Sequence, residues 1–131
     1  MLDFATLRLK PAPNQCLVAP AGITPQAQPH LAAPEFPVAA AKLYAATEAA
    51  IAAMPRTRIL ESDPAQFAFE AEQRSAFFGF RDLISVKVVS LAPKRASLAL
   101  YSRSLVGYSD LGVNASRVKA ILAAIPAQLA K

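Results

Sequence analysis

Residues 83–104, LISVKVVSLAPKRASLALYSRS, contain two runs in which apolar and polar side chains alternate. The two runs are 83–91 and 97–104, and their period of two is typical of a β-strand with one buried face. Two similar runs precede them at 57–61 and 66–74. Together the four runs predict an antiparallel sheet in meander order.

The alternation assigns each side chain to a face of this sheet. Asp63 and Pro64, between the first two runs, stand in the order favoured by a type I turn, which supports their pairing as a hairpin. The face expected to meet the helices carries Ile59, Phe67, Phe69, Ile84, Val86, Val88, Leu98 and Leu100. The opposite face carries Arg58, Glu70, Glu72, Arg74, Ser85, Lys87, Tyr101 and Arg103. This pattern predicts a sheet that is wet on one side, where cross-strand ion pairs account for the charges.

Helical spacing of apolar residues flanks the four strands on both sides. The first helix is predicted over about 38–53 and ends at Pro55, and the second over about 115–125 ends before Pro126. Asn114 suits the N-cap of the second helix. The expected fold is therefore α+β, with a four-stranded antiparallel sheet and two helices on one face.

The beginning of the chain has a different composition. Residues 11–34 hold no Asp, Glu, Lys or Arg but contain six prolines, which remove donors from ladders and helices. Apolar residues in the same stretch can lie along a folded body. We therefore expect residues 1–36 to form an extended proline-rich arm, packed on or beside a single α+β domain at 37–131.

Composition limits the chemistry of the 131-residue chain. A single cysteine, Cys16, excludes an internal disulfide or a Cys-rich zinc site, and a single histidine, His30, removes the commonest general base from most sites. We expect no cofactor and no metal. The net charge of +5 comes from scattered Lys and Arg, so no nucleic-acid partner is predicted. No apolar stretch is long enough for a transmembrane segment and no signal-peptide pattern is present, which predicts a cytoplasmic protein.

Two segments, 69–82 (FEAEQRSAFFGFRD) and 101–117 (YSRSLVGYSDLGVNASR), resemble the signatures of the uncharacterised domain of unknown function 1499 family. The resemblance covers about 37–125. One departure is Ala115, where relatives often carry a basic residue. The matching positions are Ser75, Phe78, Phe80, Asp82, Ser102, Arg103, Ser104, Gly107, Ser109, Asp110, Gly112, Asn114 and Arg117. The resemblance implies a fold unit and a marked loop, without an established reaction, cofactor or partner.

The loop that leads into the second helix is the densest polar stretch. Free backbone donors at a helix N-terminus, together with arginines and serine hydroxyls, can hold a phosphate or carboxylate. The same polar residues also suit a tight loop that satisfies its own backbone. The predicted ligand-binding residues are Arg74, Ser102, Arg103, Ser104, Ser109, Asp110, Asn114 and Arg117.

These observations favour a non-enzymatic binding module that holds an anionic small molecule or an acidic partner at the sheet face and the 102–117 loop. One alternative is an enzyme that acts on a phosphate- or carboxylate-bearing substrate, with Asp110 as acid or base and Arg103 and Arg117 as charge clamps. Another is an accessory subunit of a larger protein complex. We expect Phe78 and Phe80 to plug the end of the core. Aromatic residues gathered on the surface would instead indicate contact with a protein or with a membrane surface.

Overall fold

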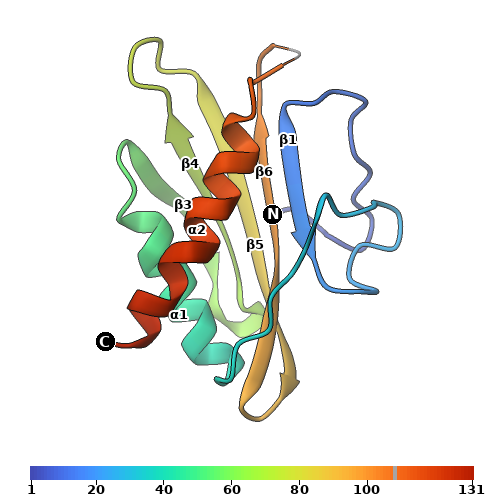
Figure 1. The fold of residues 1–131 in the computed structure, drawn as a ribbon, viewed down its shortest axis with the longest axis vertical. Helices are drawn as coiled ribbons and strands as arrows, with labels where there is room; N and C mark the ends of the chain where they lie inside the picture. The colour runs from blue at the N-terminus through green and yellow to red at the C-terminus, as the bar shows by residue number, and fades with distance from the viewer. Residues whose placement is uncertain (108) are drawn as a thin grey trace.

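The computed structural model describes residues 1–107 and 109–131 and has an α+β fold, with two helices on one face of a six-stranded mixed sheet (Figure 1). The strand order is β2-β1-β6-β5-β4-β3, in which β1 and β2 are parallel and all other neighbours are antiparallel. The elements are β1 (Gln15–Ala19), β2 (Leu31–Ala32), α1 (Ala40–Ala52), β3 (Thr57–Asp63), the short 3-10 helix η1 (Pro64–Gln66), β4 (Ala68–Arg74), β5 (Arg81–Ala92), β6 (Arg95–Ser104) and α2 (Val113–Leu129).

The predicted four-stranded antiparallel sheet is wrong, although the α+β class is right. Strands β3 to β6 form the expected meander, but β1 pairs with β6 on its other side and β2 adds a parallel edge. The error came from the prolines of the arm. Pro13 and Pro20 flank a proline-free stretch in which every residue keeps its N–H donor, and all five residues of β1 are buried. The arm therefore supplies strands. The division into an arm at 1–36 and a domain at 37–131 stays a prediction.

The main core lies between the sheet and the two helices. The side chains that alternation assigned to this face are found there: Phe69, Ile84, Val86, Val88, Leu98 and Leu100 are buried, with Ile59 and Phe67 packed against them. The helices contribute Leu43, Ile51, Val118, Ile121 and Ile125, whose exposed fractions are at or near zero. The predicted inward face of the strands is thus confirmed.

Helix α2 is longer at both ends than the apolar spacing indicated. It begins at Val113, so Asn114 is a buried residue inside the first turn and the N-cap position belongs to Gly112. It also continues past Pro126 to Leu129. A proline removes only its own donor and disturbs the preceding turn. The remaining ladder continues, as shown by the bond from Ala130 N to the Pro126 carbonyl.

The other face of the sheet is only partly wet, because residues of the arm cover it near β1 and β6. Phe4, Leu7 and Ala27 pack there against Leu17 of β1 and Tyr101 of β6, forming a second, smaller core. Towards β3 the face remains polar. No helix in the part of the chain that the structure describes is long and apolar enough to cross a membrane.

Cys16 and His30 have structural positions in this architecture. Cys16 is buried in β1, and burial raises the pKa of its thiol, which makes the reactive thiolate scarcer. His30 Nδ1 accepts a hydrogen bond of 2.8 Å from the backbone N–H of Leu17. Both residues therefore take part in the packing and hydrogen bonding of the fold.

Candidate functional site

Strand β6 sends its predicted site residues to opposite faces of the sheet. Ser102 and Ser104 point toward α2, whereas Arg103 lies on the arm-covered face because successive side chains alternate. Arg103 Nη1 donates to Ser85 Oγ at 2.7 Å, and its guanidinium lies 4.8 Å from the ring centre of Tyr101. Burial lowers the pKa of Arg103. Arg103 and Arg117 therefore do not form a joint anion clamp.

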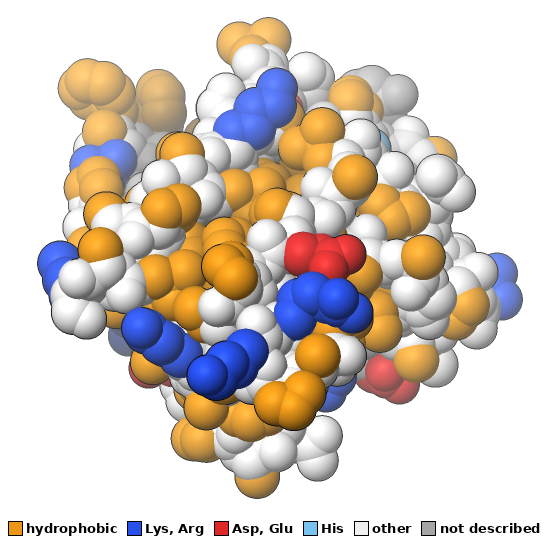
Figure 2. Space-filling view, turned by 60° about the horizontal axis from the view of Figure 1, so that its bottom comes forward, with side chains coloured by type: hydrophobic (Ala, Val, Ile, Leu, Met, Phe, Trp, Pro, Cys, Tyr) orange, Lys and Arg blue, Asp and Glu red, His pale blue; other side chains and the backbone are white. Residues whose placement is uncertain are grey.

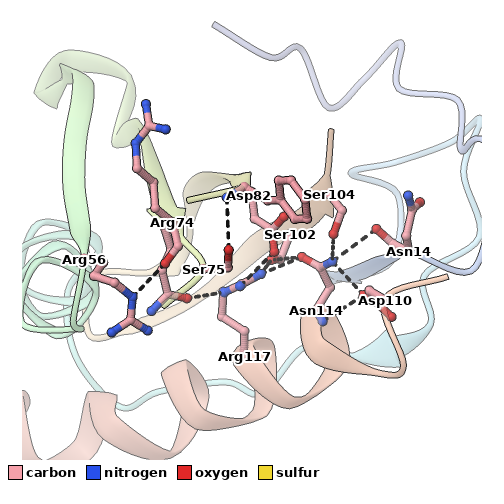
Figure 3. A network of polar contacts seen from close by, with 12 residues as sticks. Asn14, Arg56, Arg74, Ser75, Asp82, Ser102, Ser104, Asp110, Asn114 and Arg117 are labelled. Atoms are coloured by element: carbon pink, nitrogen blue, oxygen red, sulfur yellow. Dashed lines mark hydrogen bonds and ion pairs between the residues drawn. The ribbon is translucent and has the colours of Figure 1, made fainter. Parts of the chain in front are cut away.

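Asn114 is the centre of a polar network beneath the 105–112 loop (Figure 3). Its Oδ1 accepts hydrogen bonds from Ser102 Oγ at 2.6 Å and from Arg117 Nη1 at 2.7 Å. Its Nδ2 donates to Ser104 Oγ at 2.9 Å, to Asp110 Oδ2 at 2.7 Å and to the Asn14 carbonyl at 3.1 Å. Asn114 and Ser102 are both 0% exposed. One side chain thus joins the arm, β6, the loop and α2.

Arg117 continues this network toward β4 and β5. Its Nη2 lies 2.8 Å from Asp82 Oδ2, and its Nε donates to Gln73 Oε1 at 2.5 Å. The side chains of Arg117 and Asp82 are 10% and 12% exposed, so water screens this ion pair weakly. Gln73 and Asp82 face each other in the β4–β5 register. The positive charge of Arg117 is therefore already neutralised within the fold.

Asp110 caps the start of α2 from the loop. Its Oδ1 accepts from Gly112 N at 2.7 Å and its Oδ2 from Asn114 N at 2.9 Å. Partial burial raises the pKa of Asp110, but the hydrogen bonds donated by Asn114 and Gly112 outweigh it, so the pKa lies below its usual 3.8. Because Asp110 is ionised and engaged with backbone donors, the geometry gives no support to the alternative of an enzyme that uses it as a general acid.

A second charged cluster lies on the polar part of the opposite sheet face. The Glu72 carboxylate is 2% exposed and contacts three arginines: Arg58 Nε at 2.7 Å, Arg74 Nε at 3.7 Å, and Arg81 Nε in a short hydrogen bond. The bond from Arg81 holds the pKa of Glu72 below its usual 4.5; burial opposes this, and Arg58 adds to the lowering. The predicted cross-strand ion pairs exist, and they join Glu72 of β4 to Arg58 of β3 and Arg81 of β5.

The lowered pKa values make the protein sensitive to acid. The folded chain gives up protons from Glu72 and Asp110 more readily than the unfolded chain does, so their contribution to stability is complete above about pH 4.5. It is lost as the pH falls through the lowered pKa values of the folded state. We expect urea unfolding measured over a pH series to show this acid limb, and Glu72→Gln to flatten it. An acid limb in Glu72→Gln identical to that of the wild type would contradict the assignment.

Beside the Asn114 network, a pocket of about 600 Å³ opens between the β4–β5 loop, the β6–α2 loop and the start of β3. Phe80, Val106 and Val113 form its apolar wall, and Asp82, Arg117 and Ser104 lie on its polar side. Arg56 lines it as well and donates through Nε to the Arg74 carbonyl at 2.8 Å (Figure 3). Among the described residues, no carboxylate lies within ion-pair distance of Arg56. Its backbone has a φ of 54°, a strained conformation of a kind that gathers at functional sites.

The structure brings together five of the eight predicted site residues: Ser102, Ser104, Asp110, Asn114 and Arg117. Ser109 lines the pocket but is exposed, and its Oγ accepts from Leu111 N at 3.3 Å. Arg74 contributes to the rim, with its guanidinium directed away from the network (Figure 3). Arg103 is on the other face. Tyr108, part of the same loop, lies outside the described residues.

Sequence reasoning missed several residues of this site: Asn14, Arg56, Gln73 and, as the partner of Arg117, Asp82. Asn14 reaches the loop from the arm, where Nδ2 donates to the Gly107 carbonyl at 2.7 Å. The strand pattern contained a signal for Gln73, because it lies on the same face as the inward residues Phe69 and Ala71. Arg56 had no such signal, since its position follows from the turn after α1.

Comparison with solved structures finds matches at low sequence identity. Ara h 8.0201 superposes with a TM-score of 0.51 at 13% identity, covering 74% of this chain and 93% of that chain. The di-domain ARO/CYC BexL from the BE-7585A biosynthetic pathway gives 0.47 at 16%, covering 75% of this chain and 42% of that one. A DUF4468 family protein from Bacteroides ovatus gives 0.31 at 19%, covering 60% and 56%. The likeness to Ara h 8.0201 shows an α+β fold and nothing about activity. No curated protein shows significant similarity to the sequence.

The family is shown by a direct match. The model of the family described as "Protein of unknown function (DUF1499)" matches residues 7–125, and the chain belongs to this family. The match extends farther toward the N-terminus than the resemblance at 37–125 suggested. It includes β1 and Asn14, which agrees with the place of both in the sheet and in the Asn114 network.

Proposed function

We propose that the protein is a non-enzymatic binding module that takes an amphipathic anion, a carboxylate or phosphate with an apolar tail, into the pocket between the two loops. The observation that carries this proposal is that the polar and apolar residues line different sides of the pocket. Arg117, Asp82, Asp110 and Asn114 pair with one another and form a polar wall. Arg56 keeps its charge available beside an apolar wall. A volume of about 600 Å³ suits a small molecule.

The division of the pocket predicts how a ligand lies in it. The apolar tail would contact Phe80, Val106 and Val113, which removes apolar surface from water on both partners. The anionic group would face Arg56, whose guanidinium can form two parallel hydrogen bonds with a carboxylate or phosphate. The sheet face that carries Arg103 takes no part, because Arg103 is engaged with Ser85 and Tyr101.

Decanoate is a suitable probe because decanol shares its tail and acetate shares its charge. We expect decanoate to raise the melting temperature and to show binding in calorimetry. Decanol should bind at least about tenfold more weakly, and acetate should show no binding. Val113→Glu should abolish binding, since it places an anion in the apolar wall at a helix N-terminus where acid is tolerated. Arg56→Gln should weaken decanoate binding about tenfold and leave decanol unchanged.

Lys94→Gln is the matched control for the change at Arg56. Lys94 is an exposed cation in the β5–β6 turn, at the other end of the sheet. The Lys94→Gln variant should bind decanoate with the affinity of the wild type. Equal binding of decanoate by the wild type and by Val113→Glu would place the interaction elsewhere on the surface and exclude the pocket.

A further inference from the structure

The β4–β5 loop holds three phenylalanines away from the core. Phe77, Phe78 and Phe80 are 94%, 77% and 51% exposed, so the expected plug at the end of the core is wrong. The loop is nevertheless ordered by its own bonds. Ser75 N donates to the Phe80 carbonyl and Phe80 N donates to Ser75 Oγ, both at 3.0 Å, and the rings of Phe78 and Phe80 stack at 5.4 Å. A turn held by hydrogen bonds thus directs the aromatic side chains toward solvent.

The β6–α2 loop lies at the same end of the molecule as the β4–β5 loop (Figure 1), and apolar side chains of this loop and of the first turn of α2 are exposed. Leu111 is 94% exposed, Val106 54% and Val113 47%. The two loops border one pocket, which Phe80 lines from one side and Val106 and Val113 from the other. Leu111 also has a φ of 56°, a conformation that favours glycine or asparagine. The exposure of Leu111 and its strained backbone both lower the stability of the fold, and no contact among the described residues compensates for them.

Arginines surround the base of the aromatic loop. Arg74 ends β4 and Arg81 begins β5, and the two face each other at the base of the loop. Arg58 lies beside them on β3, opposite Glu72. Three guanidiniums share the single carboxylate of Glu72, so the cluster keeps an excess of positive charge. Their side chains are 48%, 42% and 71% exposed. On the face that Figure 2 shows, Lys and Arg side chains lie among hydrophobic and neutral side chains, and one group lies against an acidic side chain.

We propose that this end of the molecule, with Phe77, Phe78 and Leu111 at its tips and Arg58, Arg74 and Arg81 behind them, docks on an anionic lipid surface. Side chains that protrude almost completely would need matching pockets in a protein partner, whereas the headgroup boundary of a bilayer accepts isolated rings. The guanidiniums lie behind the aromatic tips, at the level where lipid phosphates would meet them. Of these residues only Arg74 lines the pocket, at its rim, so the proposal is independent of the pocket ligand.

Tryptophan fluorescence gives a direct test, because the chain has no tryptophan of its own. Phe77→Trp should shift its emission to the blue when phosphatidylcholine vesicles containing phosphatidylserine are added, and far less with phosphatidylcholine alone. Leu91→Trp, near the end of β5 that lies opposite the aromatic loop, should not shift its emission with either vesicle. An equal response of both reporters, or no response of Phe77→Trp to the anionic vesicles, overturns the proposal.

Vesicle co-sedimentation separates the contributions of the tips and the arginines. The double variant Phe77→Ser/Phe78→Ser should lose about tenfold or more in affinity for anionic vesicles while it still binds decanoate. Arg81→Gln should weaken binding, whereas Lys94→Gln should not. Leu111→Asn should bind vesicles less well and yet melt at a higher temperature, a combination that a structural role would not produce. Wild-type affinity in the double variant, or self-association through the tips with no affinity for vesicles, would contradict lipid docking.

Discussion

Replacing Asn114 with leucine is expected to lower the free energy of unfolding by about 4 kcal/mol, because buried partners of its side chain lose their hydrogen bonds together. Ser102 and Ser104 are themselves buried, and the Asn14 carbonyl and Asp110 would also lose a donor. A leucine fills the space but offers no polar atom. In thermal unfolding the loss corresponds to a fall in melting temperature of roughly 10 °C or more.

Urea denaturation followed by circular dichroism measures this effect at Asn114. Ser116→Ala is the matched control, because Ser116 is exposed on the same helix and only its backbone N–H bonds to Gly112. It should stay within about 0.5 kcal/mol of the wild type. If Asn114→Leu did the same, the network in Figure 3 would not be what joins the arm to α2.

Arg117→Met is expected to cost about 3 kcal/mol, chiefly because Asp82 is left as an unpaired carboxylate in a place that water reaches poorly. Gln73 and Ser102 lose a donor as well. The physical cause can be isolated by removing the stranded charge. The double variant Arg117→Met/Asp82→Leu should recover much of the loss, since a buried ion pair replaced by apolar side chains is often close to neutral.

The same denaturation measurements give the energy of the double-mutant cycle for Arg117 and Asp82. A double variant as unstable as the sum of the two single changes would mean that the two residues act separately. Arg58→Met provides the comparison for an exposed arginine on the opposite face. Its side chain is 71% exposed, so its ion pair with Glu72 should contribute less than about 1 kcal/mol.

The strands of the meander could be predicted because apolar side chains that pack against the helices alternate with mostly polar side chains on the other face. Val86 and Lys87, for example, are neighbours in sequence and differ in burial as the pleat requires. Strand β1 gave no such signal. Leu17 packs under the arm and Val18 under the helices, so both faces are apolar and alternation disappears. The prolines on either side therefore led to the prediction of an extended arm, because the strand between them has only five residues.

The candidate site was half predictable for a related reason. The stretch from Ser102 to Arg117 contains most of the network, because a polar loop before a helix is visible in sequence. The rest of the site depends on the register in which β4 and β5 pair. Asp82 reaches Arg117 only because the β4–β5 pairing sets it opposite Gln73, and the length of the connecting loop does not fix that pairing. Phe78 was expected in the core on its residue type, while the hydrogen bonds of the loop turn it outward.

The pairing of β1 with β6 has a consequence for the order of events during synthesis. Leu17 and Val18 are synthesised well before the strand that pairs with theirs, because β6 ends at Ser104 and the rest of the meander lies between the two. Until then this segment has no sheet to join, and long-range pairing of this kind is slow. The prolines around it limit premature pairing with other chains. The composition that makes the arm a poor strand by itself therefore protects it while it waits for its partner.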